Sequence, residues 1–454
     1  MNVADLLLRT TARQPDRPAL LLGADVTSYA ELAEAAARVA ALLAAAGVGP
    51  GDRVGVMLPN VPQFAAIYYG VLRAGAVVVP MNPLLKAREI GYYLADSGAR
   101  LLFAWHTAAG EARAGAGDAA LLVVDPDTFA ALLAPHAPAD GAVRRAGDDT
   151  AVILYTSGTT GRPKGAELTH ANLTRNAEVT LGDLLRLSPD DRVFGGLPLF
   201  HSFGQTVTLN AAMASGASLL LLPRFDAATA LDLMATNGAT VFAGVPTMYS
   251  AMLGVADAPA LPALRVCVSG GAALPVEVLH AFEARFGCVV LEGYGLSETS
   301  PVASFNRPDG TRKPGTIGTP VTGVSMRVVD GAGRDVEHGA VGEIAIRGHN
   351  VMKGYWHKPE ATAEVLYEHP DVAEAAVIGI AHATLGEEVG AAVALKPGAT
   401  VTETELRDHV KRQVAAYKYP RVVWFVDALP KGPTGKVLKR EIVPPASVQK
   451  GASA

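Results

Sequence analysis

The chain has 454 residues, with 39 Lys and Arg against 44 Asp and Glu, which gives a formal net charge of −5. Half of the residues are hydrophobic and only 18% are charged, so an intrinsically disordered chain is excluded. The small net charge argues against a surface that coats nucleic acid, and no apolar run reaches the ~18 residues that a membrane span needs.

The N-terminus and the cysteines bear on location and redox chemistry. Asp5 stands where a secretory signal carries positive charge, so we expect no export and predict a cytoplasmic protein. The two cysteines, Cys267 and Cys288, each lie in an apolar run, and neither belongs to a CxxC pattern. We therefore expect no disulfide framework and no thiolate metal site, and we predict that both side chains are buried.

Most of the chain alternates helices with short apolar strands. A Ser-x-x-Glu pattern ahead of an Ala/Leu-rich stretch predicts a helix over 27–46 that ends at Gly47. Further strands and helices are predicted at 52–58, 63–74, 76–80, 90–97, 101–104, 211–216, 218–222, 227–238 and 241–243. This alternation predicts α/β units around largely parallel sheets.

Three other regions have a different texture. Residues 108–147 show weak periodicity and are predicted to form a loosely structured connection. Residues 315–347 contain short strands that predict a small β-rich subdomain. After Pro359, helices near 361–369 and 403–414 and strands at 374–380, 388–395 and 422–426 predict a small α+β domain. The expected fold class is thus α/β, with a large N-terminal domain (1–358) followed by a small C-terminal α+β domain (359–454).

A glycine- and hydroxyl-rich segment, Tyr155–Gly165, follows the predicted strand 151–154. Its backbone amides, hydroxyls and one ammonium group suit an anion such as a phosphate. The spacing is not GxxxxGK[ST], so a Walker ATPase is not predicted, and a plain surface turn is the alternative. The candidate binding residues are Thr156, Ser157, Gly158, Thr159, Thr160, Gly161 and Lys164.

A second segment, Glu292–Thr299, follows a predicted strand at 288–291. A carboxylate at the end of a strand, among glycines and hydroxyls, suits a hydrated Mg²⁺ that bridges phosphates, although a solvated Glu in a turn is the alternative. Between the two segments, the small residues of Ser269–Pro275 leave room for a flat ring or a ligand tail.

Together these segments resemble the adenylate-forming (AMP-binding) superfamily, which includes acyl-CoA synthetases, non-ribosomal adenylation domains and beetle luciferases. The resemblance runs from about Leu7 to Glu441, and Tyr155–Gly165, Gly293–Thr299, Gly342–Tyr355 and Lys431–Arg440 occur in the family's order. Within this family the chain looks most like a fatty-acid or medium-chain acyl-CoA ligase. The resemblance implies that ATP and Mg²⁺ activate a carboxylic acid to an acyl-adenylate, which coenzyme A then converts to a thioester.

The resemblance also implies roles for single residues. The Thr156–Lys164 segment binds the β- and γ-phosphates, Glu298 holds Mg²⁺ and Thr299 contacts phosphate. The adenine is bordered by Gly271, Ala272 and Tyr294.

Two further residues carry implied roles in catalysis. His201 lies within Pro198–Gly204, which matches the family segment whose aromatic or His side chain gates the acyl pocket, and a structural histidine is the alternative. Amino-acid-activating relatives tend to carry an Asp here that pairs with an ammonium group, so His201 favours a plain carboxylic acid. Lys436 matches the mobile lysine that bridges the carboxylate and the α-phosphate, and an exposed Lys in a Gly/Pro loop is the alternative. Lys436, Lys164, Glu298 and His201 are the expected catalytic residues.

One departure from the family is expected to matter. A typical member carries several dozen residues between the segments that resemble Lys358–Thr362 and Val365–Pro370, and here the two are joined. No residue therefore inherits the ribose-binding Asp, the hinge or the opening hairpin of the small domain, and one helix over 360–369 would replace the hinge. We expect impaired ribose binding, an impaired domain rotation, or both.

The expected partners are a carboxylic acid, ATP and coenzyme A, without nucleic acid or a membrane span, and a homodimer is left open. Two other functions stay open as well. The first is that of a non-catalytic acyl- or nucleotide-binding protein, and the second is that of an adenylating enzyme that loads a carrier protein. Acid-dependent pyrophosphate exchange separates the first of these from an enzyme, and the accepting thiol separates the second from a coenzyme A ligase.

Overall fold

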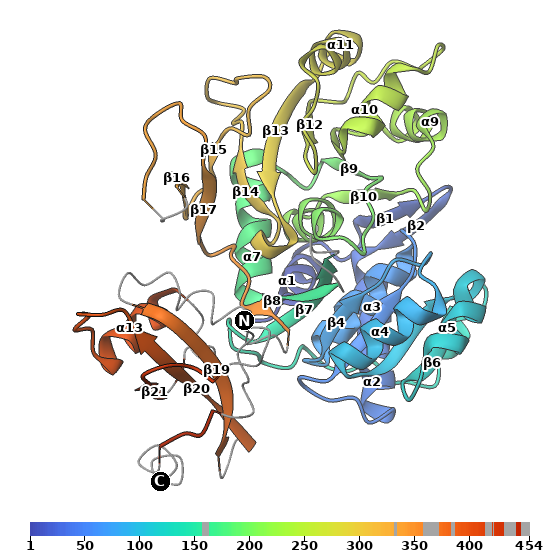
Figure 1. Cartoon of the computed structure of the whole chain (residues 1–454). Helices are drawn as coiled ribbons and strands as arrows, with labels where there is room; N and C mark the ends of the chain where they lie inside the picture. Colours follow the sequence, from blue (N-terminus) through green and yellow to red (C-terminus); the bar gives the residue numbers. More distant parts are fainter. Residues whose placement is uncertain are drawn as a thin grey trace. The chain divides into compact units, whose positions relative to one another are not determined.

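The computed structural model of the chain describes residues 1–156, 163–330, 334–356, 372–382, 386–413, 420, 422–430 and 442–445. The chain forms two compact units (Figure 1). The first comprises residues 1–326 and 346–352, and the second comprises 327–345 and 353–454. No helix in the described residues is long and apolar enough to cross a membrane.

A nine-stranded sheet forms one half of the first unit. Its six central strands run parallel, and antiparallel strands flank them at both edges. In sheet order the strands are β15 (Thr319–Pro320), β14 (Val302–Phe305), β13 (Val289–Gly295), β12 (Val266–Ser269), β11 (Val241–Gly244), β9 (Arg192–Gly195), β10 (Ser218–Leu221), β1 (Pro18–Leu22) and β2 (Asp25–Ser28). Buried apolar side chains dominate its central strands, as expected for a sheet covered on both faces.

A second sheet of the first unit carries the glycine- and hydroxyl-rich segment. Its strands are β8 (Lys164–Thr169), β7 (Thr150–Thr156), β4 (Val77–Pro80), β3 (Arg53–Met57), β5 (Ala99–Trp105) and β6 (Ala120–Val124). All neighbouring pairs are parallel except β7 and β8, which form an antiparallel hairpin. The predicted parallel α/β arrangement is therefore confirmed.

Helices pack against both sheets (Figure 1). They are α1 (Asp5–Arg13), α2 (Tyr29–Ala45), α3 (Pro62–Arg73), α4 (Ala87–Ser97), α5 (Ala109–Gly115), α6 (Phe129–Leu133), α7 (His170–Val179), α8 (Ala211–Ser215), α9 (Ala227–Asn237), α10 (Pro246–Leu253) and α11 (Val276–Phe286). Short turns of other helical types are η1 (His106–Ala108), η2 (Thr180–Leu184), η3 (Gly204–Asn210) and η4 (Ser297–Thr299).

The start of α2 shows how local sequence sets a boundary. The amide of Glu31 donates to Ser28 Oγ at 3.2 Å, and the Glu31 carboxylate accepts from the Ser28 amide at 2.7 Å. This reciprocal pair satisfies two amides that the first helical turn leaves without a partner. Gly47, with φ of +72°, follows the helix, as predicted.

Two predictions about the first unit are wrong. Residues 108–147 contain α5, β6 and α6 rather than a loose connection. These elements are short, and β6 is a half-exposed edge strand, so the hydrophobic pattern is weak although Val124, Phe129 and Leu133 are buried. In addition, Glu292–Gly295 continues β13 instead of following it, because β14 pairs with this stretch, for example Tyr294 with Ser304.

The two cysteines are buried, as predicted. Cys267 and Cys288 lie on or beside the neighbouring strands β12 and β13, and their sulfur atoms are 3.5 Å apart without a disulfide bond. Their surroundings are the apolar core of the first unit. Both therefore act as small core residues in this structure.

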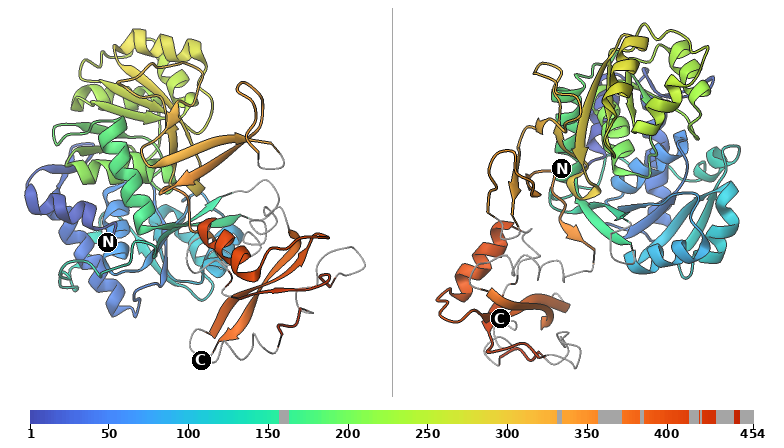
Figure 2. Two further views of the ribbon diagram at one scale, coloured as in Figure 1. Left: turned by 90° about the vertical axis from the view of Figure 1, so that its left-hand side faces the viewer. Right: turned by 45° about the horizontal axis from the view of Figure 1, so that its top comes forward.

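In its described residues, the second unit contains a three-stranded sheet on which a helix packs (Figure 2). Its elements are β19 (Val372–His382), β20 (Gly386–Leu395), α13 (Glu403–Gln413) and β21 (Val422–Phe425). Leu406 and Val410 of α13 are buried against Val393 and Val423 of the sheet. These elements agree with the predicted strands and helix of the small domain, whereas the helix predicted near 361–369 lies outside the described residues.

The remaining described strands are three short ones. β16 (Val324–Val329) and β17 (Glu343–Gly348) form a two-stranded sheet, and β18 (Gly354–Tyr355) follows them in the chain. The short strands predicted within 315–347 are β15, β16 and the larger part of β17.

Candidate active site

The turn end of the β7–β8 hairpin holds two of the predicted phosphate-binding residues. Thr156 ends β7 and Lys164 begins β8, and the two residues are paired across the ladder. Ser157, Gly158, Thr159, Thr160 and Gly161 lie outside the described residues, and so does Lys436. The described part of the segment therefore presents one hydroxyl and one ammonium group at neighbouring positions.

Glu298 reaches this hairpin from a distant part of the sequence. The hydroxyl of Thr156 donates to Glu298 Oε1 at 3.3 Å, although 142 positions separate the residues. The backbone of Glu298 is also fixed, because its carbonyl accepts from the Met352 amide at 2.8 Å. Two of the predicted site segments thus meet. The Glu298 carboxylate lies beside the Thr156 hydroxyl, and Lys164 is paired with Thr156 on the neighbouring strand.

These groups fit a magnesium–triphosphate ligand. Carboxylate and hydroxyl oxygens are hard ligands of the kind that Mg²⁺ prefers. The described residues contain no cluster of three or more His, Cys, Asp or Glu that could hold a metal. A single carboxylate agrees with the usual behaviour of Mg²⁺, which keeps several waters and takes its other ligands from substrate phosphates.

The turn around Glu298 is held by its own backbone contacts. The hydroxyl of Thr299 donates to the carbonyl of Pro301 at 2.6 Å and accepts from the Leu296 amide at 2.8 Å. Thr299 is buried, so its hydroxyl shapes the turn that presents Glu298. Gly295 is required here because a Cβ would lie 1.7 Å from the Pro301 carbonyl oxygen.

The residues predicted to border the adenine lie at one edge of the nine-stranded sheet. β12 and β13 are parallel neighbours, with Ser269 paired to Glu292. Gly271 and Ala272 follow β12 and are exposed, and Tyr294, near the end of β13, is half-buried. Because the carboxyl ends of parallel strands meet at one edge, the structure brings these three residues to the same side of the sheet.

The segment that carries His201 contacts both of these regions. Ser202 Oγ lies 3.3 Å from Ser297 Oγ, next to Glu298. The Phe203 ring lies 3.2 Å from the position of a Cβ on Gly270, so it packs directly on the backbone that leads to Gly271. The segment therefore contacts both the turn around Glu298 and the backbone that precedes Gly271.

The surroundings of the His201 imidazole disfavour its charged form. Its side chain is exposed to solvent, but surrounding protein atoms desolvate it and lower its pKa below the ordinary histidine value. A neutral imidazole can donate or accept one hydrogen bond without placing a charge beside an acyl chain.

Sequence reasoning missed the side chains that hold the hairpin from the other side. Tyr92 and Asp96, on α4, hydrogen-bond the chain at both ends of the hairpin turn, and Tyr93 stacks on Tyr155. No motif marks these residues, and only a tyrosine pair on a predicted helix distinguishes them in the sequence.

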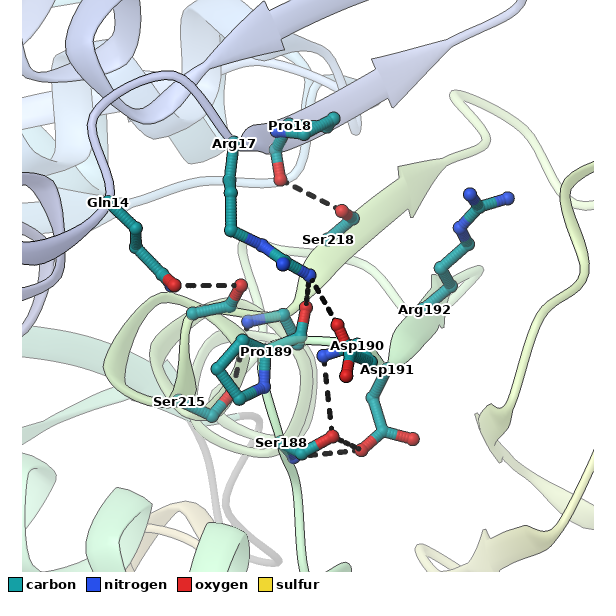
Figure 3. Close-up of polar contacts among 12 residues, drawn as sticks. Gln14, Arg17, Pro18, Ser188, Pro189, Asp190, Asp191, Arg192, Ser215 and Ser218 are labelled. Atoms are coloured by element: carbon teal, nitrogen blue, oxygen red, sulfur yellow. Dashed lines mark hydrogen bonds and ion pairs between the residues drawn. The ribbon is translucent and has the colours of Figure 1, made fainter.

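A second polar cluster, shown in Figure 3, surrounds a cavity of about 170 Å³. Arg17 donates to Asp190 at 2.9 Å, and Ser218 donates to the carbonyl of Pro18 at 2.8 Å. These groups satisfy one another and join loops of the nine-stranded sheet. The cluster is therefore part of the scaffold and offers no convergent groups for chemistry.

The chain belongs to the family of AMP-binding enzymes, because its residues 7–356 match the model of that family. Residues 362–436 match the model of the AMP-binding enzyme C-terminal domain. The predicted resemblance, fold class and class of enzyme, an acid–thiol ligase, are confirmed.

Relatives and solved structures cover nearly the whole chain. The sulfoacetate–CoA ligase of Cupriavidus necator is 34% identical over 97% of this chain and 97% of its own length. The long-chain-fatty-acid–CoA ligase of Bacillus subtilis is 32% identical over 97% of this chain and 94% of its own. The crystal structure of ATP-bound MatB from Rhodopseudomonas palustris has a TM-score of 0.73 at 33% identity, covering 97% of this chain and 98% of that one.

Proposed function

We propose that this chain activates a fatty acid with ATP and transfers the acyl group to coenzyme A. The contact that carries the proposal is the hydrogen bond from Thr156 to Glu298, since it brings the phosphate-binding hairpin to the magnesium-holding acid. ATP, Mg²⁺ and coenzyme A are the cosubstrates and metal of such ligases. The named relatives act on different acids, so the acid is proposed from the surroundings of His201.

The first step joins two negatively charged reactants. A carboxylate oxygen attacks the α-phosphorus of ATP, and the bond from that phosphorus to the pyrophosphate oxygen breaks. Glu298 would hold Mg²⁺, which would supply positive charge against this repulsion. Lys164 adds an ammonium group, and the Thr156 hydroxyl, which donates its proton to Glu298, holds that carboxylate in place. We assign Lys436 to bridge the carboxylate and the α-phosphate.

In the second step the thiol sulfur of coenzyme A attacks the acyl carbon, its proton is lost, and AMP leaves with the electron pair of the acyl–oxygen bond. Gly271, Ala272 and Tyr294, at one edge of the sheet, suit the adenine of the departing nucleotide. The flat ring lies against backbone and an aromatic side chain, which small residues permit.

The environment of His201 supports an uncharged acyl chain. Its lowered pKa leaves a neutral imidazole, and the neighbouring Phe203 is an aromatic hydrocarbon surface. An anionic tail, as in sulfoacetate, has no counter-charge in this segment, because the residues of Pro198–Gly204 include no Lys or Arg. A fatty acid therefore fits this segment better than a second anionic group.

The joined segment near residue 363 lowers the rate that we expect for thioester formation. The alignment with the Cupriavidus necator ligase runs over 497 positions, more than the 454 residues of this chain, which agrees with an internal deletion. We propose that the boundary between the large and small domains lies at 358/359 and that the chain forms the adenylate faster than the thioester. A nucleotide- or acyl-binding protein without turnover is the second candidate, and the same shortening favours it.

ATP–pyrophosphate exchange tests the proposal. Acids from acetate to palmitate are compared with sulfoacetate at saturating ATP, and Lys164→Ala serves as the site-defective control. Exchange that rises with the alkyl chain supports a fatty-acid ligase, and thioester formation with coenzyme A but not with a carrier protein assigns the acceptor. Binding of ATP without acid-dependent exchange would instead support the non-catalytic candidate.

A further inference from the structure

Helix α4 contacts the chain on both sides of the hairpin turn. The Tyr92 hydroxyl donates to the Pro163 carbonyl at 2.7 Å, and the Tyr155 hydroxyl donates to Asp96 Oδ2 at 2.7 Å. Tyr155 directly precedes Thr156, and Pro163 directly precedes Lys164. Each of the two site residues is therefore next in sequence to a residue that α4 anchors.

Aromatic contacts reinforce the anchor at Tyr155. The Tyr93 and Tyr155 rings are stacked, with centroids 4.3 Å apart and planes at 16°, and the Tyr92 ring meets Tyr155 edge-on at 6.1 Å. Burial and the Asp96 carboxylate raise the pKa of the Tyr155 hydroxyl, which consequently keeps its proton and remains the donor.

The helix is itself held in place. Arg53, on β3, donates to the carbonyls of Ser97 and Gly98 at 2.7 and 2.8 Å, and these residues form the C-terminal end of α4. Leu94 is buried and lies 3.2 Å from the position of a Cβ on Gly55, so the helix packs closely on β3. Because α4 is fixed against β3, its contacts with Tyr155 and Pro163 also fix the turn end of the hairpin.

We propose that Tyr92, Tyr93 and Asp96 are positioning residues that hold Thr156 and Lys164 in their binding arrangement before nucleotide arrives. Fixing these residues in advance lowers the conformational entropy that nucleotide binding must otherwise remove. The inference rests on the proposed function, because that function assigns Thr156 and Lys164 to the phosphates. Its effect is on nucleotide affinity, since none of the three anchoring side chains is assigned to the reacting atoms.

Two substitutions in the full chain test this role. Tyr92→Phe removes only the hydroxyl that reaches Pro163, and Tyr93→Leu removes the ring that stacks on Tyr155. We expect the Kd of ATP with Mg²⁺, measured by calorimetry, and the KM for ATP in pyrophosphate exchange to rise ~2- to 10-fold for each, as expected for one hydrogen bond or ring contact. The kcat at saturating ATP should stay within about twofold of that of the unmodified chain, and Tyr93→Phe should restore the affinity.

Tyr29→Phe is the matched control. The Tyr29 hydroxyl also donates to a backbone carbonyl, that of Ala217 at 2.7 Å, but in the core. This variant should lower the melting temperature and leave the Kd of ATP unchanged. An unchanged Kd in both Tyr92→Phe and Tyr93→Leu, or an equal rise in Tyr29→Phe, would overturn the inference. Failure of the unmodified chain to bind ATP would instead overturn the proposed function on which the inference rests.

Discussion

Glu298→Gln separates the charge of the acid that we propose to hold Mg²⁺ from its structural contacts. A glutamine carbonyl oxygen can still accept the Thr156 hydroxyl, which lies 3.3 Å from the carboxylate, and the bond from the Met352 amide involves only backbone. The fold around the turn should therefore persist. What is lost is the negative charge that draws Mg²⁺ to the triphosphate.

The size of the effect follows from the charge that Glu298 would present to Mg²⁺. An interaction with a charged partner contributes ~1.5–3 kcal/mol, which corresponds to a ~10- to 150-fold change in an equilibrium constant. We expect the concentration of Mg²⁺ that gives half-maximal pyrophosphate exchange to rise by about this factor. The melting temperature should fall by no more than about 2 °C, since Glu298 is only half-buried.

A magnesium titration of pyrophosphate exchange, run beside Glu298→Asp, makes the comparison. The shorter acid keeps the charge and should retain more of the magnesium response than the amide does. The reasoning is refuted if Glu298→Gln shows the magnesium dependence of the unmodified chain. A large loss of thermal stability would show instead that the side chain holds the turn together.

Three further predictions follow from other contacts. Lys164→Ala should weaken ATP binding ~10- to 150-fold while Lys164→Arg, which keeps the charge, weakens it less, as calorimetry can measure. Burial lowers the pKa of His170 to about 4, so as the pH falls the histidine of the unfolded chain takes up a proton before that of the folded chain. The free energy of unfolding should therefore decrease by up to about 3 kcal/mol as the pH drops from 6.5 towards 4. Urea titrations at several pH values should show a weaker pH dependence of this free energy in His170→Asn. Ser28→Ala removes the cap of α2 and should lower the free energy of unfolding by about 1 kcal/mol, whereas Glu34→Ala, on an exposed face of that helix, should change it by less than about 0.5 kcal/mol.

The elements that could be predicted carry strong local signals. The N-terminal cap of helix α2 and the glycine that follows the helix can both be recognised in the sequence. The strands before Glu292 and Thr156 are continuous apolar runs. Their boundaries are less certain from sequence, because pairing with a distant strand decides where a strand ends. β13 extends to Gly295 only because β14, which comes later in the chain, lies alongside it.

The candidate site could be predicted only where residues cluster in sequence. The family motifs led to Glu298 and Lys164, but the meeting of the two segments depends on a contact across 142 positions. The tyrosine pair of α4 did not identify a functional role, since a Tyr-Tyr pair on a helix is equally typical of a packed surface. Their relevance appears only when α4 is placed beside the ends of β7 and β8.

The central claim is that the hairpin end and Glu298 together bind ATP through Mg²⁺. Calorimetric titration of ATP into the full chain, with Mg²⁺ and then with a chelator, measures this directly. The account predicts saturable binding that Mg²⁺ strengthens and that Glu298→Gln makes nearly independent of the metal. Absence of binding, or equal affinity with and without Mg²⁺ in the unmodified chain, would contradict it.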